Sequence, residues 1–272
     1  MSLKSVIKSA GVYDTALSYL RKTAIHYYKK RIEQDKKLKT IVNELNLMET
    51  LKTHYGWRKD EDEFILRHLS IKIAEIIKTL KERLQLADPN YQNTLILDAG
   101  DPDGFVLKSI GSTKGISLNI LDSCVKQILS LGGSPVKGDV QMMPFKNKSF
   151  SYVLCFETLE HLENPILGLN ELARVCNKKI FISIPWVKKT GIHEDNYMLN
   201  RPEVEQHVFE FSPTDFAKVV THASLKITYY KEIKIFPKIY NPLHNFLLRK
   251  FYYPSFFPKF QFYELTKVET YD

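Results

Sequence analysis

The residues best suited to binding chemistry form one acidic loop, Asp98-Ala-Gly100-Asp101-Pro102-Asp103-Gly104. The loop follows a short apolar run, and in open α/β sheets ligands bind beyond the carboxyl ends of the strands. Glycines at such a position let the backbone turn tightly and approach a ligand closely. The three carboxylates disfavour a pyrophosphate and suit a ligand that carries positive charge. Considered alone, such a loop is more often an ordinary strand–helix connection.

A second group of reactive side chains follows the later apolar run at residues 151–156. Glu157 and His161 come directly after this run, and His207 lies further along the chain, in Glu205-Gln-His207-Val-Phe-Glu210. Imidazole and carboxylate groups beside a reacting centre can remove a proton. His161 and His207 are therefore candidate catalytic residues, with Glu157 as a further candidate base. The alternative is that each histidine only packs at the edge of the sheet, which is the commoner role of a lone histidine.

The elements that must position these side chains alternate along residues 94–235. Short apolar runs predict strands at residues 94–98, 114–118, 135–138, 151–156, 179–184 and 226–235. Helices are predicted between them, at residues 105–110, 120–131, 165–175 and 213–223. This alternation is typical of an α/β fold with a parallel sheet.

Residues 1–90 are predicted to form a helical N-terminal extension. The clearest apolar stripe at helical spacing consists of Ile65, Leu69, Ile73, Ile76, Leu80 and Leu84. Asp88-Pro89 is expected to end this helix, because the residue before a proline is driven out of helical geometry. The basic clusters near residues 21–39 are more typical of a solvated helix face than of a binding site.

Three further segments complete a pattern with the loop at Asp98: Gly138-Asp139, Pro144-Phe145 and Glu160-His161-Leu162. Together they make residues 94–235 resemble the class I S-adenosylmethionine-dependent methyltransferases, and within them the small-molecule, type 11 members. The resemblance implies an enzyme that uses S-adenosylmethionine. It also implies a Rossmann-like sheet of the seven-stranded type with helices on both faces, in a domain spanning residues 91–235.

The resemblance assigns cofactor contacts to residues at the ends of the strands. Asp98 would engage the ammonium group, Phe156 the methionine portion, and Asp139 the adenine amino group. The remaining assigned positions are Gly100, Asp101 and Gly104 in the loop, Ser117 and Leu118 at the ribose, and Val140 beside the purine ring.

Two positions depart from the family pattern. Pro102 replaces the middle glycine of the loop, which fixes φ and removes a backbone donor. Ser117 stands at or next to the place where the family has an Asp or Glu that takes both ribose hydroxyls, and a neutral hydroxyl binds more weakly than a carboxylate. Two alternatives are that Asn119 substitutes for it and that Ser117 only caps the following helix. These departures support an alternative function, a non-catalytic binding or scaffold protein with a degenerate cofactor site.

The preferred function is methyl transfer to a small-molecule acceptor of the sugar, lipid-linked or isoprenoid type. Candidate acceptor contacts lie in residues 185–202, namely Trp186, His193, Tyr197 and Arg201, although packing within the loop explains them equally well. A second alternative, an RNA methyltransferase, is motivated by the basic N-terminal residues. The chain lacks both a recognisable RNA-binding module and the Asn/Asp-Pro-Pro-aromatic signature, so a nucleic-acid partner is not expected.

Composition sets the remaining expectations. The 272 residues are 44% hydrophobic and 26% charged, and no apolar run approaches the ~20 residues of a membrane span, so a cytoplasmic protein is expected. The net charge of +8 favours acidic partners, which could be nucleic acid, anionic lipid surfaces or phosphorylated substrates, and does not choose among them. The aromatic and basic segment 236–272 suits a peripheral membrane contact, or else packs on the domain or on a partner in a dimer. The three cysteines lack paired ligand spacing, and no metal site is predicted.

Overall fold

The computed structural model of the protein describes residues 12–55, 63–192, 207–235 and 259–268. The chain divides into two compact units. One contains the N-terminal helices as far as Lys78, and the other contains the sheet, from Thr79 to Ile233 and again from Phe260 onward. Within the described ranges, no helix is both long enough and apolar enough to cross a bilayer.

The described residues before the sheet form helices α2 (Val12–Gln34), α3 (Lys36–Glu44), α4 (Leu47–Tyr55) and α5 (Glu63–Ala87). Asp35 caps α3, because its side chain accepts a hydrogen bond from Leu38 N at 3.0 Å. Between α2 and α5, the buried side chains of Tyr28 and His68 are hydrogen-bonded at 3.0 Å. The predicted helical N-terminal region is confirmed.

One seven-stranded sheet has the order β3-β2-β1-β4-β5-β9-β8. Its strands are β1 (Leu95–Ala99), β2 (Lys114–Asn119), β3 (Pro135–Lys137), β4 (Phe150–Phe156), β5 (Cys176–Pro185), β8 (Leu225–Lys234) and β9 (Lys259–Lys267). The first five in the spatial order run parallel, and β9 is antiparallel to β5. A separate ladder joins β6 (Gly191–Ile192) and β7 (Phe209–Glu210). The expected Rossmann-like α/β fold is confirmed.

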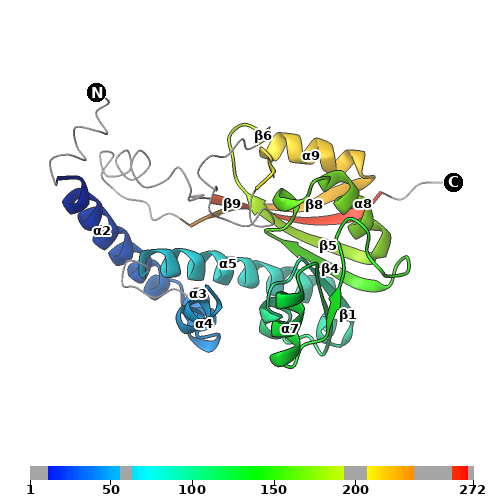
Figure 1. Ribbon diagram of the computed structural model, residues 1–272, viewed down its shortest axis with the longest axis horizontal. Helices are drawn as coiled ribbons and strands as arrows, with labels where there is room; N and C mark the ends of the chain where they lie inside the picture. The colour runs from blue at the N-terminus through cyan, green and yellow to red at the C-terminus, as the bar shows by residue number, and fades with distance from the viewer. Residues whose placement is uncertain (1–11, 56–62, 193–206, 236–258, 269–272) are drawn as a thin grey trace. The chain divides into compact units, whose positions relative to one another are not determined.

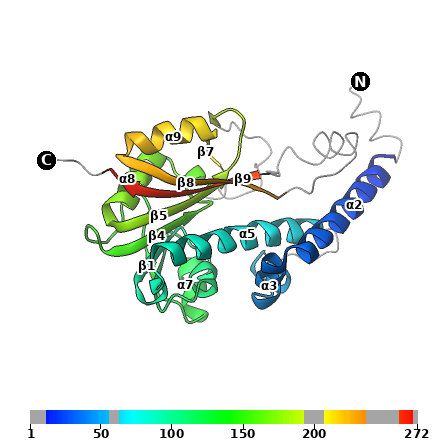
Figure 2. The same cartoon turned by 180° about the vertical axis from the view of Figure 1, so that it is seen from behind.

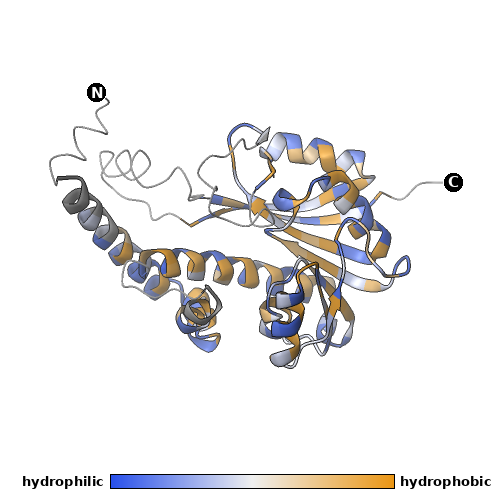
Figure 3. Ribbon diagram, in the orientation of Figure 1, coloured by the Kyte–Doolittle hydropathy of each residue, from blue (hydrophilic) through white to orange (hydrophobic). Residues whose placement is uncertain are grey.

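Helices cover both faces of this sheet. They are α6 (Phe105–Ser109), α7 (Asp122–Ser130), α8 (Pro165–Val175) and α9 (Pro213–His222), with short 3-10 turns η2 (Tyr91–Asn93) and η3 (Leu159–His161). Helices α8 and α9 lie on one side and α7 on the other, as both cartoon views show (Figure 1, Figure 2). Because the central strands are covered on both faces, they carry apolar runs rather than an alternating pattern, and hydrophobic stretches run through the sheet (Figure 3). Every strand and helix predicted in residues 94–235 is present, with ends shifted by at most three residues.

Strand β9 was not predicted, and it lies beyond residue 235, the predicted end of the domain. Its Phe260, Phe262 and Leu265 are buried, yet the strand also buries the polar side chains of Gln261 and Glu264. Gln261 Nε2 donates to the carbonyl oxygens of Pro185 and Phe211 at 2.9 and 2.7 Å. A strand that is buried on both faces is predicted from a continuous apolar run, and the buried polar residues interrupt that run in this segment. The hydrophobic pattern therefore did not predict a strand here.

Candidate active site

The carboxyl ends of β1 and β2 lie side by side. In the parallel register Asp98 stands opposite Ser117, and Ala99 opposite Leu118. On its other side β1 pairs with β4, so the chain order reverses across β1. Ligands of open α/β sheets bind at such a switch point.

The loop after β1 is fixed by glycine geometry and by one carboxylate. Gly100 and Gly104 have φ of +93° and +74°, a region that glycine adopts without strain. Oδ1 of the buried Asp101 accepts hydrogen bonds from Asp103 N and Gly104 N at 3.0 and 2.8 Å. The loop therefore keeps a defined shape with Pro102 in place of the middle glycine.

We expect Gly100→Ala to lower the free energy of unfolding by about 2–4 kcal/mol, through the left-handed φ and through overpacking. A Cβ at this position would meet Thr158 Oγ1 at 2.3 Å and Cγ2 at 2.5 Å. Gly132→Ala is the matched control, because Gly132 has a φ of +80° but nothing within 4 Å of the added Cβ. Urea denaturation measures the free energy of unfolding of both variants. Equal decreases in Gly100→Ala and Gly132→Ala would mean that the contact with Thr158 contributes nothing.

Ser117 holds the loop rather than standing free at the end of β2. Its Oγ donates to Asp101 Oδ2 at 2.5 Å, and Asn119 Nδ2 donates to Asp101 O at 2.9 Å. Burial and the nearby charge of Asp103 raise the pKa of Asp101, although the hydrogen bond from Ser117 acts to lower it. A carboxylate thus lies at the end of β2, but it comes from the loop and not from the strand.

Asp98 has a buried carboxyl group with an oxygen that accepts no hydrogen bond from the described residues. The residue is 3% exposed, and its Oδ2 has no hydrogen-bond partner among the described residues. Burial raises its pKa well above the ordinary value, and the carboxylates of Asp101 and Asp103 raise it further. A ligand that brings a protonated nitrogen would supply the missing hydrogen bond and relieve the charge repulsion.

Asp139 and Val140 follow β3, beside β2 in the sheet. Asp139 Oδ1 accepts a hydrogen bond from Gln141 N at 2.8 Å, which gives the turn a fixed shape, and Val140 is buried. Gly138 lets this turn approach β2, because a Cβ there would lie 2.8 Å from Leu118 Cδ1.

The end of β4 carries a strained backbone. Phe156 is the last residue of the strand, and Glu157 after it has a φ of +50°, which is rare for a residue with a side chain. Glu157 Oε1 accepts a hydrogen bond from Ser183 Oγ at 2.8 Å. Strained backbone of this kind often occurs at functional sites.

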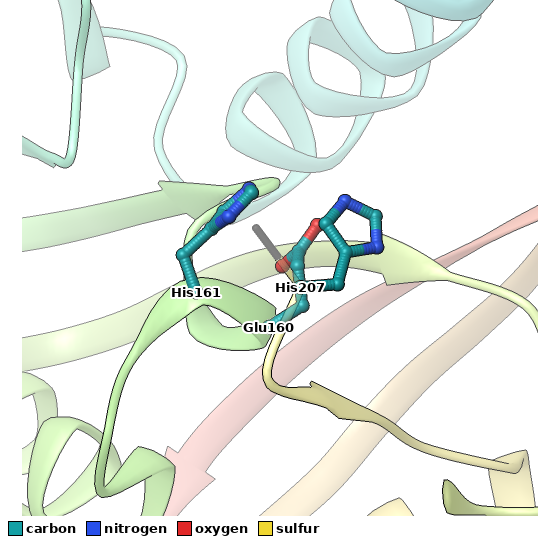
Figure 4. Close-up of side chains that lie close together, drawn as sticks. All are labelled: Glu160, His161 and His207. Carbon is teal, nitrogen blue, oxygen red and sulfur yellow. The ribbon is translucent and has the colours of Figure 1, made fainter. Parts of the chain in front are cut away.

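The two predicted catalytic histidines lie together although they are far apart in the sequence. The rings of His161 and His207 meet edge to face with centroids 4.8 Å apart (Figure 4). A backbone hydrogen bond from Val208 N to Glu160 O, 2.6 Å long, joins η3 to the segment that carries His207. His207 Nδ1 is 2.9 Å from Oε1 of Glu210, the last residue of β7.

Glu160 completes this cluster and was missed as a functional residue, as was Glu210. One donor atom from each of Glu160, His161 and His207 lies within 4.8 Å of the others, a spacing at which they could hold a metal ion. Of the predicted acceptor contacts, Trp186 directly follows β5 and is half-buried. His193, Tyr197 and Arg201 lie outside the described residues.

Residues 97–182, from the middle of β1 almost to the end of β5, match the sequence model of a family described as a methyltransferase domain. The chain is a class I S-adenosylmethionine-dependent methyltransferase. The acidic loop, Asp98 and the end of β4 all fall within the matched residues. The two departures noted above, Pro102 and Ser117, are therefore departures within a methyltransferase.

Relatives agree with this assignment. The methyltransferase is 25% identical over 199 residues to a protein named ubiquinone biosynthesis O-methyltransferase from Rickettsia typhi, across 67% of this chain and 78% of the relative. Magnesium protoporphyrin IX methyltransferase from Synechocystis, solved with bound S-adenosylmethionine, has the same fold at 13% identity. The TM-score is 0.55, over 80% of this chain and 89% of that one. The YcgJ protein of Bacillus subtilis also shares the fold, with 13% identity and a TM-score of 0.52, over 72% of this chain and 99% of that one.

The structure brings the predicted cofactor residues of this methyltransferase to one edge of the sheet. Asp98, Ser117, Leu118 and Phe156 lie at the carboxyl ends of parallel strands. Gly100, Asp101 and Gly104 lie in the loop after β1, and Asp139 and Val140 follow β3. Their contacts with the cofactor remain the prediction made from the resemblance.

Proposed function

We propose that this methyltransferase transfers a methyl group from S-adenosylmethionine to an oxygen atom of a small-molecule acceptor of the sugar, lipid-linked or isoprenoid type. The pairing of His161 with His207 beside the end of β4 carries this proposal, because a hydroxyl acceptor must lose its proton during the transfer. The printed name of the Rickettsia relative, an O-methyltransferase of ubiquinone biosynthesis, supports oxygen as the acceptor atom. We place the enzyme in the cytoplasm, where a lipid-linked acceptor would bring it to a membrane surface.

We infer that Asp98 binds the ammonium group of the cofactor. Its unsatisfied Oδ2 and its raised pKa make it a site for a cation. The backbone of Gly100 to Gly104 would run beneath the methionine portion, and Phe156 would contact it from β4. When bound, S-adenosylmethionine supplies a methyl carbon already activated by the sulfonium, so the protein's task is alignment and exclusion of water.

We infer that Asp139 accepts a hydrogen bond from the adenine amino group, with Val140 beside the ring. Ser117, Leu118 and the carboxylate of Asp101 would lie at the ribose. The direct bond between Ser117 and Asp101 supports this placement, since the pair presents a charge-assisted hydrogen-bonding group where the family has a strand-end acid.

The histidine pair would activate the acceptor hydroxyl. Nδ1 of His207 lies 2.9 Å from Oε1 of Glu210, and in the tautomer with its N–H on Nδ1 this nitrogen would donate to the carboxyl oxygen and Nε2 would keep a lone pair. A neutral imidazole of this tautomer can act on an acidic hydrogen next to it.

Calorimetric titration with S-adenosylhomocysteine tests the cofactor site. We expect wild-type protein to bind it with a micromolar Kd and Asp139→Ala to bind at least about tenfold more weakly, as loss of a hydrogen bond to a charged group predicts. Asp139→Asn is the matched variant, because its amide oxygen still accepts a hydrogen bond and should lose less. No binding by well-folded wild-type protein would instead support a degenerate site.

A further inference from the structure

Among the residues that the structure describes, Glu160, His161 and His207 form a cluster of possible metal ligands outside the cofactor loop (Figure 4). We propose that these three residues bind one divalent cation beside the end of β4. Glu160 and His161 come from η3, and His207 comes from the segment leading into β7. The hydrogen bond from Val208 N to Glu160 O joins the two segments, and one donor atom from each of the three side chains lies within 4.8 Å of the others.

The donor set favours a transition-metal cation. Two imidazoles and one carboxylate are ligands that suit Zn²⁺ and neighbouring divalent ions, whereas Mg²⁺ and Ca²⁺ prefer oxygen alone. Sites with three protein ligands keep a further position open for water or substrate, which is the pattern of catalytic rather than structural sites. Glu160 is 1% exposed, so a bound cation would place its charge directly beside a buried carboxylate.

Glu210 provides the support that metal-binding histidines usually have. A histidine that ligates a metal through one ring nitrogen commonly donates its other N–H to a carboxylate, which sets the tautomer and the ring orientation. Glu210 is 4% exposed and lies 2.9 Å from His207 Nδ1. Nε2 of His207 is thereby the nitrogen with the lone pair that a cation requires.

This inference rests on the proposed function and specifies how the histidines act. The acceptor hydroxyl binds at the open position of the cation, which lowers its pKa, and its proton leaves to solvent. The oxygen then forms a bond to the methyl carbon while the carbon–sulfur bond breaks, with the electron pair going to sulfur. With the cation bound, His161 and His207 activate the hydroxyl as ligands of the cation. This role replaces direct removal of the proton by an imidazole nitrogen.

The test is calorimetric titration of tag-free, EDTA-dialysed full-length protein with Zn²⁺. We expect one ion per chain, and we expect His161→Ala and His207→Ala each to weaken binding at least about tenfold. Glu210→Gln should weaken binding by about 10–100-fold, as for other residues that orient a ligand. His222→Ala, an exposed histidine in the last turn of α9, is the matched control and should bind Zn²⁺ as the wild type does.

A parallel titration with S-adenosylhomocysteine separates the two proposals. Unchanged affinity for it in the histidine variants shows that they are folded. Wild-type protein that binds S-adenosylhomocysteine but not Zn²⁺, or variants that bind Zn²⁺ as tightly as the wild type, would overturn the metal site and leave the proposed cofactor binding standing. Protein that binds neither would overturn both.

Discussion

Asp98→Asn is expected to make the ligand-free protein more stable and the cofactor complex much weaker. The buried, unsatisfied carboxyl costs free energy in its ionised form, and a neutral amide removes most of that cost, about 1–3 kcal/mol. The same substitution removes the charge that would hold the ammonium group of the cofactor, which we expect to weaken S-adenosylhomocysteine binding about 30–100-fold. Thermal unfolding and calorimetry measure the two effects.

The gain in stability should depend on pH in a defined direction. The folded-state pKa of Asp98 is raised above its ordinary 3.8, so its contribution to stability is intact below that pH and is lost as pH rises through the folded-state pKa. The difference between wild type and Asp98→Asn should therefore be small near pH 4 and largest at neutral pH. Asp103→Asn is the control, because its amide keeps an oxygen that can accept a hydrogen bond from Phe105 N. Its difference in stability from the wild type should change less with pH. A less stable Asp98→Asn protein at pH 7 would contradict the argument.

Glu264→Gln is expected to lower the free energy of unfolding by about 3 kcal/mol, because removing one partner of a buried ion pair leaves the others uncompensated. The side chain of Glu264 is fully buried, and its two oxygens lie 2.7 Å from Arg83 Nε and 2.5 Å from Lys179 Nζ. Thr228 Oγ1 also donates to Oε1 at 2.7 Å. These contacts join β9 to α5, β5 and β8 within the unit that contains the sheet.

Urea denaturation of Glu264→Gln should be compared with that of Lys218→Gln. Lys218 pairs with Asp215 at 3.1 Å, but its side chain is 73% exposed, so its loss should change stability by less than about 0.5 kcal/mol. Burial acts to raise the pKa of Glu264, but hydrogen bonds from Arg83, Lys179 and Thr228 outweigh it and lower the pKa. Its stabilisation is therefore present above pH 4.5 and is lost as pH falls through the lowered value. Equal decreases in the free energy of unfolding of Glu264→Gln and Lys218→Gln would contradict the argument that a buried ion pair matters more than an exposed one.

The sequence was sufficient to predict the parallel part of the fold. Strands such as β4 are apolar over most of their length, with Ser151 as the polar exception in β4, and are bounded by turns, so pattern and length agree. Helix α8 was predicted with its observed bounds, since Pro165 occupies a first-turn position and the side chain of Asn164 caps the helix. Strand β9 escaped prediction because Gln261 and Glu264 point into the interior, where their partners come from other strands and from α5.

The candidate site also has a part that the sequence predicts and a part that it does not. The cofactor edge was predictable, because the ends of parallel strands must meet at one edge of the sheet. The contact between Ser117 and Asp101 was not, since it depends on the shape of a loop that departs from the family pattern. Glu160 and Glu210 were missed because the cluster with the two histidines forms only when two segments distant in the sequence come together in the fold. The spacing of these residues in the sequence does not predict that they are close in space.

The position of β9 also has a consequence for the order of events during synthesis. Its partner β5 emerges early, and Lys179 and Glu264, which join the two strands, are 85 residues apart. Until residues 259–267 have left the ribosome, β5 and β8 each present an unpaired edge where β9 will insert. Unpaired edges invite pairing with other chains, and such long-range closure is slow. The nascent protein should therefore depend on chaperones most strongly in the interval before β9 is released.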